Sequence, residues 1–138
     1  MKKLLLAAIA VFAMLLTTAC SKELVLEGTI WTGSFIEKND ATDSDMHTYD
    51  LKMNFATANT GTWNIKMTQA TLEDGETVTN TEAVTLDFGY AISGNAVNIT
   101  TKSIDDPETL YFTGVVNDDH DELTVSIDAN LVKLKKQK

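Results

Sequence analysis

The chain has little of several residue types that often hold small proteins together or bind anions. Its 138 residues include one cysteine, one proline, two histidines and no arginine. A single cysteine cannot form an intrachain disulfide, so the fold must depend on its apolar core. The absence of arginine removes the guanidinium fork that binds phosphate or carboxylate through two parallel hydrogen bonds.

Negative charge dominates what is present. Twenty acidic residues stand against eleven lysines, which gives a formal net charge of -9. Proteins that bind nucleic acids gain their affinity by neutralising phosphates with lysine and arginine. We therefore expect no nucleic-acid partner, and we expect no direct adsorption to an anionic membrane face.

The first nineteen residues have the organisation of an export signal. Lys2 and Lys3 precede an uninterrupted apolar run, Leu4 to Leu16, and small residues then lead to Cys20. As a helix, these 13 apolar residues would cover about 20 Å of a hydrocarbon core that is roughly 30 Å thick. The pattern predicts a cleaved signal peptide over residues 1–19 and not a membrane span.

The end of this signal resembles the lipobox of bacterial lipoproteins, an aliphatic residue and two small residues before a cysteine. Leu16 lies four positions before Cys20, where the pattern usually has three. The resemblance implies that Cys20 becomes the acylated N-terminus, typically carrying palmitate, and two or three acyl chains anchor a protein stably. With Ser21 next, it implies attachment to the outer membrane, facing the periplasm or the surface. The alternative is an ordinary secretory signal cut after Ala19, which leaves Cys20 a free thiol.

Residues 20–23 are then a short tether, and residues 24–138 form a single domain in which the dominant period is two. Each run keeps one face apolar and one polar, which predicts half-buried antiparallel strands. The apolar residues of the first run change parity between Ile30 and Trp31, which predicts a bulge. No window after the signal has an amphipathic helix pattern. The predicted strands cover residues 24–36, 49–55, 63–67, 84–92, 97–99, 110–112, 123–127 and 130–135.

Turn residues fall between these runs. They lie at Asn59-Thr60-Gly61, Asp74-Gly75, Ser93-Gly94-Asn95, Asp105-Asp106-Pro107 and Asn117 to Asp121. Glycine and asparagine supply the positive φ that tight hairpins need. Eight strands joined in sequence predict an all-β fold, an up-and-down antiparallel β-barrel that leaves no open edge. A two-sheet β-sandwich is the alternative.

The chain resembles the small lipocalin-like lipoproteins of Bacteroidetes in three features. These are the lipobox, the segment Leu26-Glu27-Gly28-Thr29-Ile30-Trp31 and the short alternating strands. Lipocalins carry Gly-x-Trp on the first strand, and here Gly28 and Trp31 are one residue further apart. Gly61-Thr62-Trp63 has the lipocalin spacing on the third predicted strand. The resemblance implies a barrel with an apolar interior that in some members binds small apolar molecules.

The sequence contains few candidate catalytic residues. His47 and His120 both lie in predicted loops among acidic residues, and a lipidated Cys20 could not act as a nucleophile. Adjacent carboxylates such as Asp105 and Asp106 point apart into water when they lie on a loop. We expect no enzyme activity and no cofactor.

Two acidic clusters are weak candidates for calcium, which takes six to eight oxygen ligands. Neither matches the twelve-residue EF-hand loop, so solvated hairpin tips are the simpler interpretation. If both clusters lay at one end of the barrel, they could form one site. The clusters are Asp40, Asp43 and Asp45, and Asp118, Asp119 and Asp121.

Large apolar side chains on the inward face are the other candidate site, because an eight-stranded barrel is either filled or wide enough for one small ligand. A packed core is one interpretation. The other is a shallow ligand site at the mouth of short strands, with Trp31, Trp63 and Tyr90 as its main contacts. The function is then either binding of a small apolar ligand or, with a packed core, interaction with an envelope protein. The candidate ligand residues are Trp31, Phe35, Met53, Trp63, Met67, Phe88 and Tyr90.

Overall fold

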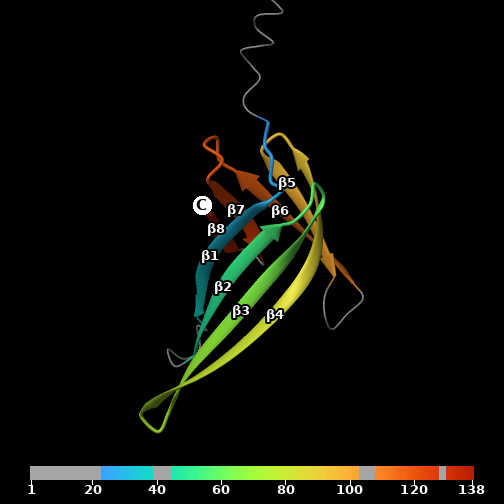
Figure 1. Ribbon diagram of the computed structural model, residues 1–138. Coiled ribbons are helices and arrows are strands. Elements are labelled where there is room, and N and C mark those ends of the chain that lie inside the picture. Colours follow the sequence, from blue (N-terminus) through green and yellow to red (C-terminus); the bar gives the residue numbers. More distant parts are fainter. Residues whose placement is uncertain (1–22, 39–44, 103–107, 128–129) are drawn as a thin grey trace, which may run out of the picture.

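The structure is a computed structural model that describes residues 23–38, 45–102, 108–127 and 130–138. Eight strands run antiparallel to one another in chain order, and the last returns to the first to close a barrel (Figure 1). The predicted up-and-down barrel is therefore confirmed, and the two-sheet sandwich is not formed. The strands are β1 (Thr29–Lys38), β2 (Asp45–Phe55), β3 (Thr60–Glu73), β4 (Glu76–Ser93), β5 (Ala96–Lys102), β6 (Thr109–Val116), β7 (Glu122–Ile127) and β8 (Asn130–Lys136).

The two ends of the barrel differ. At one end lie the segment that enters β1 and the connections β2–β3, β4–β5 and β6–β7 (Figure 1). We call this the closed end, because Leu24 and Leu26 fold over it and are buried in the core. The opposite end, where β2, β6 and β8 begin, we call the open end. A side chain as fully buried as Leu26 stabilises the fold by roughly 1.5–3 kcal/mol relative to an exposed one.

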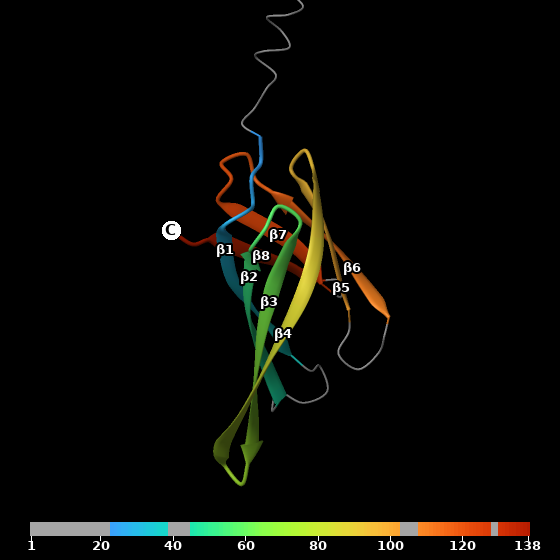
Figure 2. The same ribbon diagram turned by 45° about the vertical axis from the view of Figure 1, so that its right-hand side comes forward.

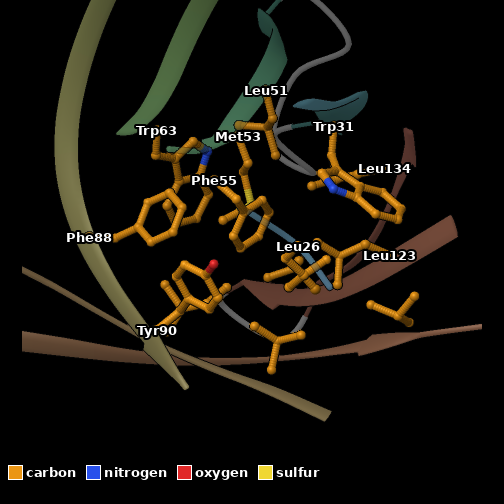
Figure 3. Close-up of a cluster of buried hydrophobic side chains, with 14 of the residues drawn as sticks. Leu26, Trp31, Leu51, Met53, Phe55, Trp63, Phe88, Tyr90, Leu123 and Leu134 are labelled. Carbon is orange, nitrogen blue, oxygen red and sulfur yellow. The ribbon is translucent and has the colours of Figure 1, made fainter. Parts of the chain in front are cut away.

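The core fills the closed end and the middle of the barrel (Figure 3). Aromatic rings meet edge to face there, with centroid distances of 5.3 Å between Phe55 and Phe88 and 4.9 Å between Phe55 and Tyr90. This is a preferred arrangement for aromatic pairs. The alternation that predicted the strands also predicted which residues point inward. The aliphatic part of the core includes Val97, Ile99, Val116, Leu123, Val125, Val132 and Leu134.

The first strand enters the barrel through a turn, and the predicted bulge is wrong. β1 pairs with β2 in one unbroken register from Thr29–Phe55 to Lys38–Met46. The change of parity comes earlier, at a turn in which Gly28 adopts a φ of +77° and Thr29 N donates to the Leu26 carbonyl at 3.0 Å. Glycine tolerates a positive φ at low cost. The turn allows Leu26, which precedes β1, and Trp31 within β1 to be buried in the same core.

Gly61 lies inside β3 and not in the turn that the sequence predicted there. The β2–β3 connection spans residues 56–59. A Cβ at position 61 would clash with the Asn54 carbonyl oxygen and would lie 2.5 Å from Cζ of Phe88. The missing side chain thus makes room for the Phe88 ring against the sheet.

Two strands are much longer than the sequence suggested. β3 has 14 residues and β4 has 18, and their pairing runs from Thr60–Gly89 to Glu73–Glu76 around the predicted Asp74-Gly75 turn. The hairpin projects beyond the open end as an arm (Figure 2). β4 pairs with β5 only from Phe88 to Ser93. Within the described chain, the stretch 76–86 of β4 therefore has no paired strand on its outer edge.

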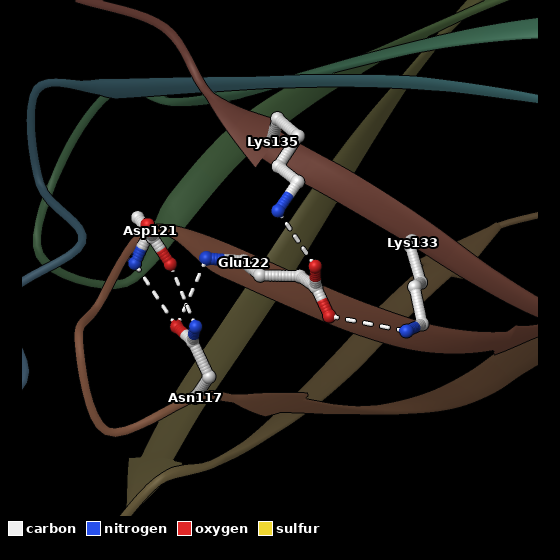
Figure 4. A network of polar contacts seen from close by, with 5 residues as sticks. All are labelled: Asn117, Asp121, Glu122, Lys133 and Lys135. Carbon is white, nitrogen blue, oxygen red and sulfur yellow. Dashed lines mark hydrogen bonds and ion pairs between the residues drawn. The ribbon is translucent and has the colours of Figure 1, made fainter.

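A polar network holds the β6–β7 hairpin at the closed end (Figure 4). The Asn117 side-chain oxygen accepts from the backbone nitrogens of Asp121 and Glu122, both at 3.0 Å. Glu122 in turn accepts from Lys135 at 2.7 Å and lies 3.5 Å from Lys133. The hydrogen bond from Lys135 is the main cause that lowers the pKa of the Glu122 carboxyl, and both lysine charges lower it further. The pair lies at the surface, where water and salt weaken such contacts.

The packing at Gly61 can be tested by substitution. We expect Gly61→Ala to lower the free energy of unfolding by about 1–3 kcal/mol, because the added methyl must displace Phe88 or the β2 backbone. Urea unfolding would measure this. Gly89→Ala is the matched control, since its Cβ would come no closer than 3.3 Å to a described neighbour, the Thr100 hydroxyl. Equal losses in both variants would contradict this packing argument.

Candidate functional site

The open end contains a pocket of about 390 Å³. Its walls come from β1, β2, β3 and β4 on one side and from β5, β6, β7 and the start of β8 on the other. Most of its lining is apolar. The lining residues are Phe35, Glu37, Tyr49, Leu51, Trp63, Ile65, Leu86, Thr101, Leu110, Tyr111, Phe112, Ile127 and Asn130.

The pocket lies where neighbouring strands stop pairing. β6 pairs with β7 only from Gly114 to Val116, although β6 begins at Thr109. β1 pairs with β8 only at Trp31 and Thr32. On the open side of these contacts, Phe112 and Ile127 are half-buried and pack against the edge of the core without closing over it.

Aromatic contacts shape the pocket. The rings of Phe35 and Tyr49 stack with centroids 4.7 Å apart and an interplanar angle of 10°. Trp63 meets Phe112 edge to face across the barrel, at 5.3 Å and 82°. The first pair lies on the wall formed by β1 and β2, whereas the second spans the barrel from β3 to β6.

Trp63 lies at the boundary between the pocket and the core. It is only 2% exposed, and its indole nitrogen has no hydrogen-bond partner among the residues that the structure describes. Figure 3 shows the nitrogen on the side of the ring that faces the barrel interior. Trp31 is the contrasting case, because its indole nitrogen donates to the Thr29 hydroxyl at 2.8 Å. An unpartnered buried donor is costly and uncommon in proteins.

Two hydroxyl groups of the pocket have partners within the barrel. The Tyr49 hydroxyl donates to Glu37 at 3.2 Å at the rim. Thr101 is buried, and its hydroxyl donates to the Asp87 carbonyl at 2.8 Å. Glu37 is the one charged residue among the described residues that line the pocket.

The predicted ligand residues fall into three groups. Phe35 and Trp63 line the pocket. Met67 is half-buried on the arm side of β3, where it pairs with Tyr49 and Glu82. The remaining four, Trp31, Met53, Phe88 and Tyr90, are buried in the core.

Tyr90 lies at the closed end and not at the mouth. Its hydroxyl donates to the Thr57 carbonyl at 2.6 Å, in the β2–β3 connection. Burial, and secondarily the charge of Glu27, raise the pKa of this phenol. Tyr90 and Trp31 thus stabilise the closed end, and of the three main contacts predicted, Trp63 alone borders the pocket.

Several pocket residues were not singled out from the sequence. Ile65, Leu110 and Ile127 have the same inward parity as the predicted residues, but parity alone does not show at which height along the barrel a side chain lies. Glu37 and Asn130 gave no sequence signal, because they come from strand ends at the rim.

The two acidic clusters do not come together. Asp45 begins β2 at the open end, whereas Asp118, Asp119 and Asp121 lie in the β6–β7 connection at the closed end, and Asp40 and Asp43 lie outside the described residues. Asp121 accepts from Asn117 at 2.6 Å, and Asp118 accepts from Asn95 at 3.2 Å. Over the described ranges, no three acidic, histidine or cysteine side chains lie close enough to hold a metal ion.

The two histidines are far apart. His47 lies in β2 and not in a loop, with its ring 6.5 Å from that of Tyr49. His120 is in the predicted β6–β7 turn, where it adopts a φ of +56°. Cys20 lies outside the described residues.

Two larger hollows, of about 790 and 530 Å³, lie on the outer surface of the sheet. Outward-facing residues such as Thr62, Thr85 and Thr100 line the first, and Asp50, Lys52 and Lys66 contribute to the second. They are open grooves along twisted strands, and the pocket at the open end is the more enclosed site.

Within the described part of the chain, no helix is long and apolar enough to cross a membrane. No family model matches the chain, and neither a curated protein nor a solved structure matches it. The pocket at the open end is thus the feature on which a function can be based.

Proposed function

We propose that the chain is a lipid-anchored, lipocalin-like binding protein that holds a small, mainly apolar ligand in the pocket at the open end of its barrel. The pocket itself carries this proposal. Its volume of about 390 Å³ falls in the range of roughly 300–1,000 Å³ that is usual for small-molecule sites. Eight apolar residues with a few polar groups at the rim also fit such a site.

The position of the proposed anchor supports access to this pocket. The described chain starts with Glu23 at the closed end, and Cys20 precedes it by three residues. Three extended residues span about 10 Å. An acylated Cys20 would therefore hold the closed end near the membrane surface, with the pocket opening on the far side, toward solvent.

Ligand binding can be tested with N-phenyl-1-naphthylamine, a neutral probe that fluoresces in apolar surroundings. We expect saturable binding to the full chain, and we expect Phe112→Ala to weaken it about tenfold, because a buried aromatic contact of this size is worth roughly 1.5–3 kcal/mol. Val115→Ala is the control on the same strand, since Val115 is 55% exposed on the outer face. Unsaturable binding, or equal effects of the two substitutions in folded protein, would count against the proposal.

The anchor can be tested by mass spectrometry of the protein from envelope membranes. We expect a chain that starts at Cys20 and carries the mass of its acyl groups. Cys20→Ser should abolish both the increment and the membrane association, because no other residue can take the thioether-linked lipid. A secreted chain starting at Cys20 with a free thiol would instead support the ordinary secretory signal.

One observation favours a second candidate function, interaction with an envelope protein. The outer edge of β4 over residues 76–86 has no neighbouring strand in the described chain. Such an edge offers backbone donors and acceptors to an added strand. It carries Glu76 and Glu82 and no lysine. Two copies would bring like charges together, so an extended segment with alternating lysines is the better complement.

This edge can be tested with two model peptides of equal length, in which threonine alternates with lysine or with glutamate. We expect the lysine peptide to shift backbone amide resonances of residues 76–86, because it complements both the backbone edge and its charge. The glutamate peptide should leave them unchanged. Equal shifts, or shifts spread over the barrel, would remove this candidate function.

A further inference from the structure

We infer that the ligand of this pocket is a cationic amphiphile, whose apolar body fills the pocket and whose ammonium group pairs with the Glu37 carboxylate at the rim. The inference rests on the proposed function and specifies its ligand. It starts from the charges at the mouth of the pocket and from the way the strand register distributes them over the two faces of the sheet.

Glu37 is the one charged group among the described residues that line the pocket. Its carboxylate accepts from the Tyr49 hydroxyl at 3.2 Å, which holds it at the rim beside the aromatic wall. An ionised carboxylate has about four lone-pair sites, so one hydrogen bond leaves room for a second donor. Over the described part of the chain, both ion pairs involve Glu122, so no lysine or histidine there neutralises Glu37.

The inner face of β1 to β4 continues from the pocket onto the arm (Figure 2). Two cross-strand rows cross this face at the mouth of the pocket: Phe35, Tyr49, Met67 and Glu82, and then Glu37, His47, Gln69 and Asn80. Lys52 and Lys66 lie in rows of the outer face, where they pair with Thr32 and Asp50. Among the described side chains, the inner face of these four strands thus carries carboxylates and a histidine but no lysine.

This distribution of charge determines which ligand fits. An anion moved into the pocket would lose its hydration without a cationic partner, and the chain has no arginine to supply one. A cation would gain the Glu37 carboxylate and the π faces of nearby rings such as that of Tyr49. The rest of the ligand would pack against apolar lining residues, among them Ile65, Phe112 and Ile127.

The test displaces N-phenyl-1-naphthylamine from the full chain with three compounds that share a naphthalene body. These are 2-naphthylmethylamine, 2-ethylnaphthalene and 2-naphthoate, which at neutral pH are a cation, its neutral isostere and an anion. Fluorescence gives the three affinities at ionic strengths of about 0.01 and 1 M, between which the Debye length falls from about 30 to 3 Å.

We expect the amine to bind about fivefold more tightly than the ethyl compound at low salt, because it gains an ion pair at an exposed rim. The anion should bind most weakly, and high salt should bring the affinities of the amine and the ethyl compound together. Glu37→Gln should do the same at low salt, because it removes the carboxylate and keeps the size of the side chain. Asp50→Asn is the matched control, since it removes an exposed carboxylate from the outer face of β2 and should keep the preference.

Two results would overturn the inference while leaving the proposed function intact. One is saturable binding of N-phenyl-1-naphthylamine together with an amine that competes no better than the ethyl compound. The other is a preference for the amine that survives Glu37→Gln, or that Asp50→Asn lowers equally, since net charge and not the rim would then be its source. If Glu37→Gln does not fold, the three compounds and their salt dependence still decide. If N-phenyl-1-naphthylamine itself shows no saturable binding, the proposed function fails, and the inference fails with it.

Discussion

Closure of the barrel depends on a short seam between its first and last strands. Along the described residues, two pairs join β1 to β8, Trp31–Lys136 and Thr32–Lys135. Gln137 N extends the seam by donating to the Ile30 carbonyl at 2.7 Å. The seam lies beside the buried segment that contains Leu24 and Leu26, so closure and burial of the entering chain stabilise the same end. A barrel has no other means of removing its two edge strands.

The position of the seam also explains why the other end is hollow. From the seam toward the open end, β1 pairs with β2 and β8 pairs with β7, but β1 and β8 no longer pair with each other. In addition, β6 pairs with β7 over only three residues. Where the strands separate, inward side chains such as Phe35 and Phe112 have no ring of neighbours to close over them. The pocket is thus a geometric result of where hydrogen bonding between strands stops. The core around Phe55 and Tyr90 is packed because the strands there remain together.

Much of the fold could be predicted from the sequence, because a period of two determines which face of each strand is buried. Trp63, Phe88 and Val97 were placed inward on that basis, and all three are buried. The height of a residue along the barrel could not be predicted, so Tyr90 and Trp63 were treated alike although they lie at different levels. The arm was missed because residues 68–83 are solvent-exposed on much of both faces and show little apolar alternation. Gly61 was read as a turn residue because its role depends on Phe88, a contact distant in sequence.

Leu86 belongs to two surfaces at once. It lines the pocket, and it lies in the part of β4 whose outer edge is open. A strand added along that edge would restrain the β4 backbone around Leu86, which forms this wall of the pocket. A ligand bound in the pocket would restrain the same stretch of backbone. By thermodynamic linkage, any such effect is reciprocal, so each occupant changes the affinity for the other by the same factor. If both proposed sites are occupied, the long β4 strand would give this barrel a physical route through which the ligand and the added strand affect each other's binding.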